Sequence, residues 1–238
     1  MEKIRKLKKY YNNINIELTD RQAEQLLQFY SLTLEWNERM NLTAIVEEDE
    51  FFLKHFIDSS LLAGCLDMNG VESLLDLGTG AGFPGIPLKI LFPSLQVVLV
   101  DALNKRVQYL AMACDSLGLE GVVCIHGRAE DLGHDTLYRE RFDLCVSRAV
   151  SELPVLVEYC VPFVKIGGSF VAYKSKDVRK EVEMAENAAS LLGARLKAVH
   201  EERIPETEIL RTFVEYEKTG PTPDKYPRKS GKPSKKPL

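Results

Sequence analysis

Residues 74–85, LLDLGTGAGFPG, run from a leucine-rich stretch directly into three alternate glycines, and this stretch decides the fold. Gly78, Gly80 and Gly82 follow Asp76 and precede a Phe-Pro-Gly turn. A central strand gains nothing from so much glycine, and a flexible linker would not carry the leucines. Because glycine lacks a Cβ, it lets the chain turn sharply and lets backbone N–H groups approach a ligand. The stretch therefore predicts a strand that ends in a ligand-binding loop.

From residue 71 onward, short runs of leucine and β-branched residues alternate with helical segments. We expect strands at 72–77, 96–101, 121–125, 142–147, 168–174, 195–203 and 211–217, and helices at 84–92, 104–118, 130–138 and 152–165. Such alternation is typical of a parallel sheet with helices on both faces. The stretch RIPETEIL between the last two strands is too short for a crossover helix, so these strands should pair antiparallel. The prediction is an α/β fold with a seven-stranded, mostly parallel sheet and one antiparallel strand.

The segment before this core is predicted to be helical. Thr19 and Gln22 form a capping box, and the apolar residues that follow have helical spacing. A second helix is expected at about 48–66. After the core, five prolines and the lack of an apolar period predict a tail that cannot fold alone. The expected organisation is a helical extension at 1–66, a core at 67–217 and a basic, proline-rich tail at 218–238.

Composition excludes several classes of protein. With 45% hydrophobic and 28% charged residues the chain is typical of globular proteins. The longest apolar runs, such as LQVVLV at 95–100, are too short to cross a bilayer, and the basic start lacks the apolar segment of a secretory signal. The five cysteines and four histidines show no ligand spacing. We therefore expect a cytoplasmic protein without disulfides, metal or membrane attachment.

Acidic residues at the ends of three predicted strands indicate one kind of cofactor. The dinucleotide fingerprint needs glycine at position 83, which is Phe83, and Asp76 would repel a pyrophosphate but attract a cationic amino group. Asp101 ends the second strand, where a carboxylate could accept hydrogen bonds from both ribose hydroxyls. Glu130 follows the third strand, where it could accept from an adenine amine. Either acid alone could instead be a turn residue or a helix cap.

The acidic loop and the strand layout resemble those of class I S-adenosylmethionine-dependent methyltransferases. Longer motifs, from about residue 15 to the end, resemble the bacterial 16S ribosomal RNA small-subunit methyltransferase G family: WNERMNLTAI (36–45), KHFIDSSLL (54–62), DLGTGAGFPGIPLKI (76–90), GRAEDL (127–132) and SRAV (147–150). This resemblance implies a Rossmann-like fold and methyl transfer to N7 of one guanosine in a loop of 16S ribosomal RNA. With the acidic loop, the expected cofactor-binding residues are Asp76, Gly78, Gly80, Gly82, Phe83, Asp101, Ala102, Leu103, Ala129, Glu130 and Arg148.

The chemistry that this resemblance implies needs no general base. Guanine N7 has an exposed lone pair, so the reaction demands in-line positioning of N7, methyl and sulfur, and we expect no catalytic acid or base. Arg148 could hold the cofactor carboxylate or the guanine O6, or pair with a local acid such as Glu152. Asn41 could lie near the target base or cap a helix. His55 and Asp58 share a helix face, but a plain surface pair would explain them.

Positive charge at the chain ends suggests a polyanionic partner. Residues 1–9 contain five basic side chains and one acidic one, and residues 218–238 contain seven and one, although the net charge is −4. Solubilising tails are the alternative. Tyr226 adds a surface on which a base could stack. The expected RNA contacts are Lys174, at the end of the fifth strand, and Lys225, Arg228, Lys229, Lys232, Lys235 and Lys236 in the tail.

These residues should contribute salt-dependent, non-specific binding, so the choice of nucleotide must come from folded elements. The expected partner is 16S ribosomal RNA, within the small ribosomal subunit or its precursor, and the expected state is a monomer. Three alternatives stay open: a methyltransferase for a small molecule or protein, an assembly factor that binds the cofactor without catalysis, and a nicotinamide oxidoreductase, against which Phe83 argues.

Overall fold

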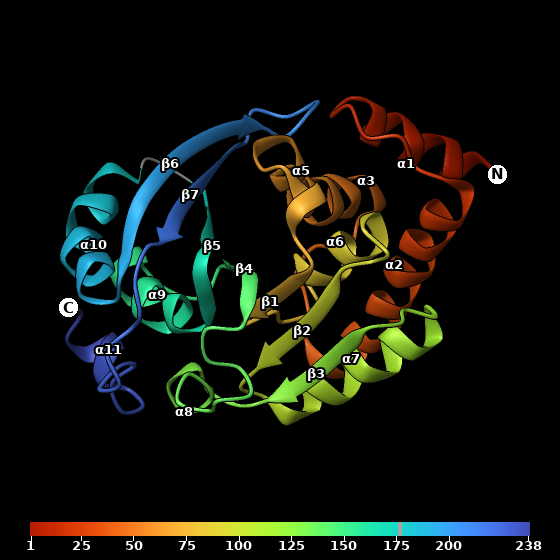
Figure 1. Cartoon of the computed structure of the whole chain (residues 1–238). Helices are drawn as coiled ribbons and strands as arrows, with labels where there is room; N and C mark the ends of the chain where they lie inside the picture. Colours follow the sequence, from red (N-terminus) through yellow and green to blue (C-terminus); the bar gives the residue numbers. More distant parts are fainter. Residues whose placement is uncertain (176–177) are drawn as a thin grey trace.

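A seven-stranded sheet forms the centre of the computed structural model, which describes residues 1–175 and 178–238 (Figure 1). The strand order is β3-β2-β1-β4-β5-β7-β6. The strands are β1 (Ser73–Leu77), β2 (Gln96–Asp101), β3 (Val122–His126), β4 (Phe142–Arg148), β5 (Val164–Lys174), β6 (Ala194–Arg203) and β7 (Leu210–Lys218). All seven strands lie close to the positions that the sequence predicted.

The pairing of the strands confirms the predicted α/β fold. β7 runs antiparallel to both β5 and β6, whereas the remaining pairs are parallel. Strand order reverses between β1 and β4, so the glycine loop after β1 lies where ligands bind in open α/β sheets. Because β7 is antiparallel, its first residues lie at the carboxyl ends of the parallel strands: Thr212 pairs with Lys174. The start of β7 is therefore beside the expected site.

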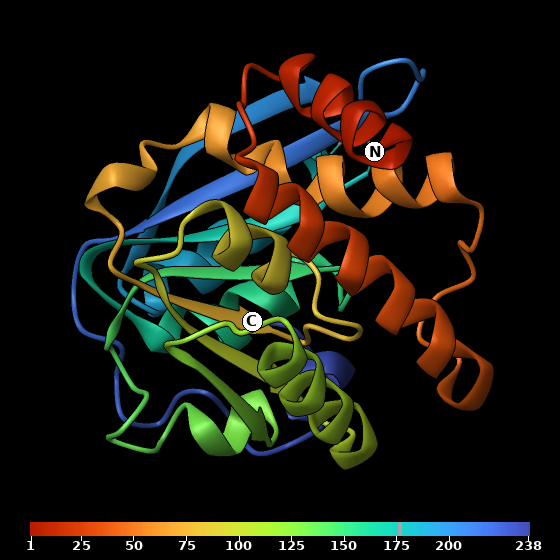
Figure 2. The same ribbon diagram turned by 90° about the vertical axis from the view of Figure 1, so that its right-hand side faces the viewer.

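Helices cover both faces of the sheet (Figures 1 and 2). One face carries α6 (Gly85–Leu91) and α7 (Asn104–Ser116), covered in turn by α1 (Glu2–Asn12) and α2 (Asp20–Met40). The other face carries α8 (Ala129–Leu132), α9 (Leu153–Cys160) and α10 (Arg179–Leu191). Short 3₁₀ helices occupy Met68–Gly70 and Val161–Phe163. The sequence did not predict α10, and α8 is shorter than the predicted helix.

The helix expected at 48–66 is a chain of shorter pieces. α3 (Glu48–Phe51) leads into a π-helix, η1 (Phe52–Ile57), which is followed by α4 (Asp58–Ser60) and α5 (Leu62–Cys65). π-Helical turns are rare and frequently occur at functional sites. These pieces, α1 and α2 share one buried apolar cluster with the sheet, so the N-terminal segment and the core pack as one body.

The C-terminal residues pack along the core and end near α9. We call residues 219–238 the C-terminal strap; it includes α11 (Lys232–Lys235). Arg139 donates hydrogen bonds to the carbonyl oxygens of Thr222 and Tyr226, and Tyr226 is buried. The sequence predicted a tail that cannot fold alone; in the structure this segment packs against the body of the protein.

Candidate active site

Asp76 shapes the glycine loop after β1. Its side chain is buried, and its Oδ2 accepts hydrogen bonds from the Thr79 hydroxyl (2.6 Å) and the Gly85 N–H (2.8 Å). Its Oδ1 has no hydrogen-bond partner among the described residues. Burial raises the pKa of Asp76 to about 6. An orphaned buried carboxylate oxygen is the kind of group that an ammonium of a cofactor would satisfy.

The loop backbone needs glycine at more than one position. Gly78, Gly80 and Gly82 have φ values of 72°, 61° and 100°, in the left-handed region where other residues are strained. At Gly78 space is also limiting, since a Cβ there would lie 2.4 Å from a methyl carbon of Val150. The predicted sharp turn is therefore present, and at Gly78 the loop also packs closely against Val150.

A cavity of about 170 Å³ opens at the carboxyl ends of β1, β2 and β3, and we call it the cofactor cavity after the cofactor-binding residues expected there. Of the expected cofactor-binding residues, Gly78, Asp101, Ala102, Ala129 and Glu130 line it. The others lie outside its lining: Asp76, Gly80 and Gly82 form the loop, and Phe83, Leu103 and Arg148 lie elsewhere. The remaining lining residues are Leu77, Val100, Gly127, Arg128, Val150 and Tyr159.

Asp101 can still accept a hydrogen bond from a ligand, although both of its carboxylate oxygens already accept hydrogen bonds from backbone N–H groups. Its Oδ1 accepts from the Leu103 N–H (2.8 Å), and its Oδ2 accepts from the Gly80 N–H (3.1 Å) and weakly from Arg106 (3.5 Å). A carboxylate has about four lone-pair sites, so a ribose hydroxyl can still be accommodated. Two of these contacts also fix Asp101 relative to the glycine loop and the start of α7.

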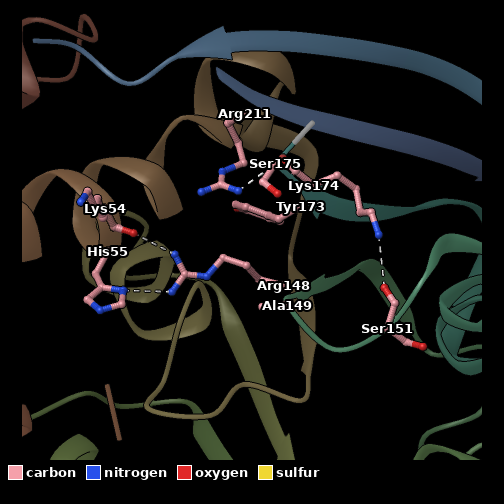
Figure 3. Close-up of a pocket in the computed structure, with 9 residues that line it drawn as sticks. All are labelled: Lys54, His55, Arg148, Ala149, Ser151, Tyr173, Lys174, Ser175 and Arg211. Carbon is pink, nitrogen blue, oxygen red and sulfur yellow. Dashed lines mark hydrogen bonds between the residues drawn. The ribbon is translucent and has the colours of Figure 1, made fainter. Parts of the chain in front are cut away.

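A second cavity, of about 310 Å³, lies beyond the ends of β4, β5 and β7 (Figure 3). We call it the basic pocket, because four cationic side chains line it and the described part of its lining contains no carboxylate. Such a pocket attracts phosphate. The lining residues are Lys54, His55, Arg148, Ala149, Ser151, Tyr173, Lys174, Ser175 and Arg211.

Asp58 is the buried acid that holds two arginines of the basic pocket. Its Oδ2 accepts a 2.6 Å hydrogen bond from Arg148, and its Oδ1 accepts from Nε of Arg211. Asp58 is fully buried, whereas both arginines reach the pocket. Arg148 thus pairs with Asp58 and not with nearby Glu152, the local alternative suggested by the sequence. Two guanidinium groups share one carboxylate, so the cluster remains net positive.

His55 is neutral and lies between Arg148 and Phe83. Nη2 of Arg148 is 3.3 Å from Nδ1 of His55, and Nε2 of His55 is 2.8 Å from the Thr43 hydroxyl. Because a guanidinium can only donate, Nδ1 must be the acceptor and Nε2 carries the proton. Burial, together with the charge of Arg148, lowers the pKa of His55 to about 3. The imidazole is therefore a fixed hydrogen-bonding group and carries no charge at neutral pH.

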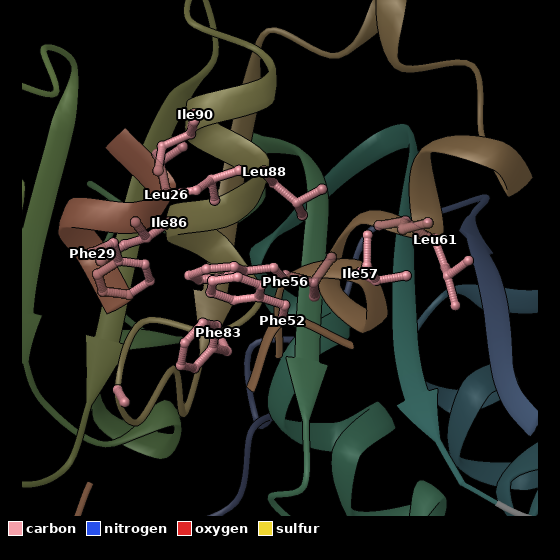
Figure 4. Close-up of a cluster of buried hydrophobic side chains, with 14 of the residues drawn as sticks. Leu26, Phe29, Phe52, Phe56, Ile57, Leu61, Phe83, Ile86, Leu88 and Ile90 are labelled. Carbon is pink, nitrogen blue, oxygen red and sulfur yellow. The ribbon is translucent and has the colours of Figure 1, made fainter. Parts of the chain in front are cut away.

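Phe83 supports this arrangement from the core side, among the buried rings of Figure 4. Its ring stacks on that of His55 at 4.5 Å and an interplanar angle of 9°, and the Arg148 guanidinium lies 5.2 Å from the ring centroid. The sequence predicted a cofactor contact for Phe83. In the structure its ring lies beneath the basic pocket, against His55 and Arg148 and outside the lining of the cofactor cavity, and the cofactor contact stays a prediction.

The loop after β4 joins the two cavities. Arg148 and Ala149 line the basic pocket, and the next residue, Val150, lines the cofactor cavity. Ala149 has φ 58°, a left-handed conformation that costs roughly 1–2 kcal/mol for a non-glycine residue. Such strain persists where surrounding contacts hold it, and it often marks functional loops. A group bound in one cavity would therefore be separated from a group bound in the other cavity by a single turn of chain.

Two positioning candidates have other partners in the structure. Lys174 lines the basic pocket, but its Nζ lies 2.7 Å from a carboxylate oxygen of Glu181 and also donates to Ser151. Asn41 has φ 49° and ends α2 as its left-handed C-cap, outside the lining of either cavity. The helix-cap alternative accounts for Asn41.

The basic residues at the chain ends differ in availability. In the N-terminal run, Lys3, Lys6, Lys8 and Lys9 pair with acidic side chains of the body, so most of its charge is neutralised within the molecule. In the strap, the Arg228 guanidinium pairs with buried Glu158. The remaining expected contacts are exposed: Lys225, Lys229, Lys232, Lys235 and Lys236.

The structure adds Arg211, Lys54 and Tyr159, which the sequence did not single out as site residues. A signal existed for Arg211: it opens the one antiparallel strand, whose start must lie at the carboxyl ends of the parallel strands. Lys54 precedes His55 within a quoted motif. Tyr159, in α9, has no comparable signal, because its place depends on how α9 packs.

Strand order, acidic glycine loop and neighbouring strand-end acids together define a Rossmann-like, class I S-adenosylmethionine-dependent methyltransferase. Solved structures share this fold at low sequence identity. An MtNAS mutant in complex with S-adenosylmethionine matches with a TM-score of 0.56 at 17% identity, over 91% of this chain and 78% of that one. A putative O-methyltransferase from Klebsiella pneumoniae matches with a TM-score of 0.53 at 18% identity, over 81% and 90%.

The chain belongs to the GidB family, described as rRNA small subunit methyltransferase G, whose model matches residues 22–210. A relative named ribosomal RNA small subunit methyltransferase G from Alkaliphilus metalliredigens is 46% identical over 98% of this chain and 97% of its own length. One of the same name from Brevibacillus brevis is 48% identical over 94% of each chain. The family and the S-adenosylmethionine cofactor predicted from the sequence are thereby confirmed.

Two further expectations concern absences. None of the helices in the described residues is both long and apolar enough to span a bilayer. Among the same residues, no three histidine, cysteine or acidic side chains gather where they could hold a metal ion.

Proposed function

We propose that this protein methylates N7 of one guanosine in a loop of 16S ribosomal RNA, with S-adenosylmethionine as the methyl donor. One observation carries the proposal: an acid-lined cofactor cavity and a phosphate-attracting basic pocket meet at a single loop, Arg148–Val150. The names of the relatives support ribosomal RNA of the small subunit as substrate. The choice of N7 is supported by His55, whose two ring nitrogens already have Arg148 and Thr43 as partners.

In this proposal the residues of the chain bind and orient the reactants. The bound cofactor supplies a methyl group on a positively charged sulfur. Asp101 accepts hydrogen bonds from the ribose and Glu130 from the adenine, which fixes the cofactor in its cavity. Arg148 and Arg211 bind an RNA phosphate or the guanine O6. They thereby orient the edge of the guanine that carries N7 toward the methyl group. Guanine N7 needs no deprotonation, which suits a site where His55 is locked as a neutral group.

We also propose that the enzyme acts as a cytoplasmic monomer on the assembled small subunit or its precursor. The support is that one chain supplies the lining of both cavities, so no second copy is needed to complete the site. Light scattering of the purified protein at micromolar concentration should give a mass near 26.9 kDa.

The test of the reaction combines purified protein, S-adenosylmethionine with a tritiated methyl group, and small subunits from cells that lack this modification. Nuclease digestion and nucleoside chromatography should show the label in 7-methylguanosine. Label in another nucleoside would overturn the N7 assignment. No label, with cofactor binding still measurable, would instead favour an assembly factor. Naked 16S RNA assayed in parallel shows whether the particle is required.

A variant of Arg148 separates its two possible roles. Arg148→Ala should lower kcat by roughly 10²–10³, the cost of removing one preorganised donor, while the Kd for S-adenosylmethionine changes by less than about 3-fold. The reason is that Arg148 lines the basic pocket and not the cofactor cavity. Arg203→Ala, which removes an exposed arginine paired with Glu208, is the matched control and should change neither quantity. A large loss of cofactor affinity at unchanged kcat would mean that Arg148 binds the carboxylate of the cofactor instead.

A further inference from the structure

The C-terminal strap contacts the cofactor cavity through Glu130. One carboxylate oxygen of Glu130 accepts a 3.0 Å hydrogen bond from the backbone N–H of Gly231. Gly231 has φ 75° and starts α11. A Cβ at this position would meet nothing within 4 Å, so the requirement for glycine is conformational. The strap thus donates a hydrogen bond to the residue expected to bind adenine.

A buried ion pair anchors the strap three residues earlier. Glu158 of α9 is fully buried and accepts hydrogen bonds from the backbone N–H of Arg228 (2.8 Å) and from its guanidinium (2.5 and 2.9 Å). An unpaired carboxylate at this depth would be costly, so the pair is a firm attachment. The next residue along α9, Tyr159, lines the cofactor cavity. The anchor and the cavity wall therefore belong to the same helix.

The strap also packs against the end of α8. Gly133 caps α8, and a Cβ there would lie 2.8 Å from the ring of Pro227. One guanidinium nitrogen of Arg139 bridges the carbonyl oxygens of Gly133 (2.6 Å) and Tyr226 (2.9 Å). A ring nitrogen of His134 lies 2.7 Å from the Pro227 carbonyl oxygen. Several contacts thus tie the chain just after α8 to the strap.

α8 needs such support because it is a single turn. Four residues are too few for a helix to be stable by itself. Two of them, Ala129 and Glu130, line the cofactor cavity. We propose that the C-terminal strap positions α8 and Glu130 for the adenine of S-adenosylmethionine, with Gly231 and Arg228 as its positioning residues.

The same segment carries exposed lysines, so its backbone and Arg228 face the body of the protein while its lysine side chains are accessible to RNA phosphates. This inference deepens the proposed function and rests on its cofactor, but not on its RNA target. By linkage, an RNA that moves the strap changes cofactor affinity, and the cofactor changes RNA affinity by the same factor.

The test measures cofactor affinity without RNA, by calorimetry with S-adenosylmethionine on full-length variants. Gly231→Val disfavours the left-handed turn, and Arg228→Ala removes the anchor. Each should weaken the Kd by about tenfold, the effect of losing one hydrogen bond to a charged group. Ser230→Ala changes an exposed side chain between Arg228 and Gly231 and is the matched control; its Kd should stay within about twofold of wild type.

Two further readouts separate positioning from general damage. In Gly231→Val the KM for S-adenosylmethionine should rise while kcat at saturating cofactor is retained, and amide hydrogen exchange should accelerate in 129–132. If Arg228→Ala fails to fold, Gly231→Val decides, because it leaves the Arg228–Glu158 pair in place. Wild-type cofactor affinity in folded Gly231→Val would overturn the inference. If wild-type protein leaves ribosomal RNA unlabelled but still binds the cofactor in a strap-dependent way, the proposed function fails and this inference stands.

Discussion

Asp58 shows how much of the basic pocket depends on one buried carboxylate. It accepts hydrogen bonds from Arg148, at the end of β4, and from Arg211, near the start of β7. Without it, two guanidinium groups would lie side by side with no counter-charge between them, at a cost of several kcal/mol. The acid therefore fixes the pocket's geometry while it leaves a net positive charge for phosphate.

Because His55 is neutral in the folded protein, we expect the free energy of unfolding to depend on pH. The folded pKa of about 3 lies below the ordinary 6.5, so the unfolded chain takes up this proton first. The contribution of His55 to stability is then complete above pH 6.5 and is lost as the pH falls toward 3. Asp76 acts in the opposite sense: burial raises its pKa from 3.8 to about 6, so its contribution is lost as pH rises through 6.

Comparison with His55→Gln isolates the histidine from Asp76. Below pH 6 the free energy of unfolding of wild type should fall more steeply than that of His55→Gln, by up to about 1.4 kcal/mol per pH unit for one proton. Urea denaturation at pH 7, 6 and 5 measures this difference. Parallel curves for the two proteins would mean that His55 titrates normally in the folded state.

At the scale of elements, the π-helix η1 serves two surfaces at once. Lys54 and His55 face the basic pocket, whereas Phe52 and Phe56 point into the apolar cluster between α2 and α6 (Figure 4). The ring of Phe56 lies 5.3 to 6.2 Å from those of its aromatic neighbours. The packing of these rings therefore sets the position of the pocket residues on the opposite side of the same turn.

Phe56→Ala tests this packing. The ring is fully buried, so its removal should lower the free energy of unfolding by about 3–5 kcal/mol through lost burial and the cavity left behind. Val46→Ala, at a position 55% exposed, should cost less than about 0.5 kcal/mol and serves as the control. Urea denaturation compares the three proteins. A loss below about 1 kcal/mol for Phe56→Ala would show that the cluster collapses around the gap.

The elements also show what the sequence could predict. The parallel strands β1 to β5 are visible because they contain short apolar runs bounded by turns, and the glycine loop follows from local chemistry alone. α10 was missed because its buried residues are the small Ala185, Ala188 and Ala189, which give a weak apolar period. The pairing of Asp58 with Arg211 spans 153 positions, and no local pattern encodes a contact at that distance.

At the scale of the whole molecule, the basic side chains that can reach a polyanion matter more than the total number of basic side chains. The net charge is −4, yet the strap lysines are exposed, and in the basic pocket two guanidinium groups share a single carboxylate. The N-terminal lysines that looked equivalent in the sequence are paired with acids of the body. Only the structure distinguishes these two runs, because most of the pairing acids lie far away in the chain.

This difference predicts the salt dependence of RNA binding. Replacing the four strap lysines 229, 232, 235 and 236 by alanine should reduce the slope of log Kd against log salt by about 3, since each released phosphate contact contributes roughly 0.7–0.9. Replacing Lys3, Lys6, Lys8 and Lys9 makes the same change of charge and should leave the slope nearly unaltered. Fluorescence anisotropy with a 16S RNA fragment measures both. Equal effects would mean that the N-terminal ion pairs open when RNA binds.

The position of the strap in the chain has a consequence for biosynthesis. Residues 219–238 follow the last strand of the sheet in the chain, and Gly231 donates its hydrogen bond to Glu130 from within this segment. A growing polypeptide can therefore form the entire sheet before the wall that faces the adenine is complete. A polypeptide that stops between the last strand and Gly231 would lack this hydrogen bond, so we expect it to bind the cofactor more weakly than a chain that carries the strap.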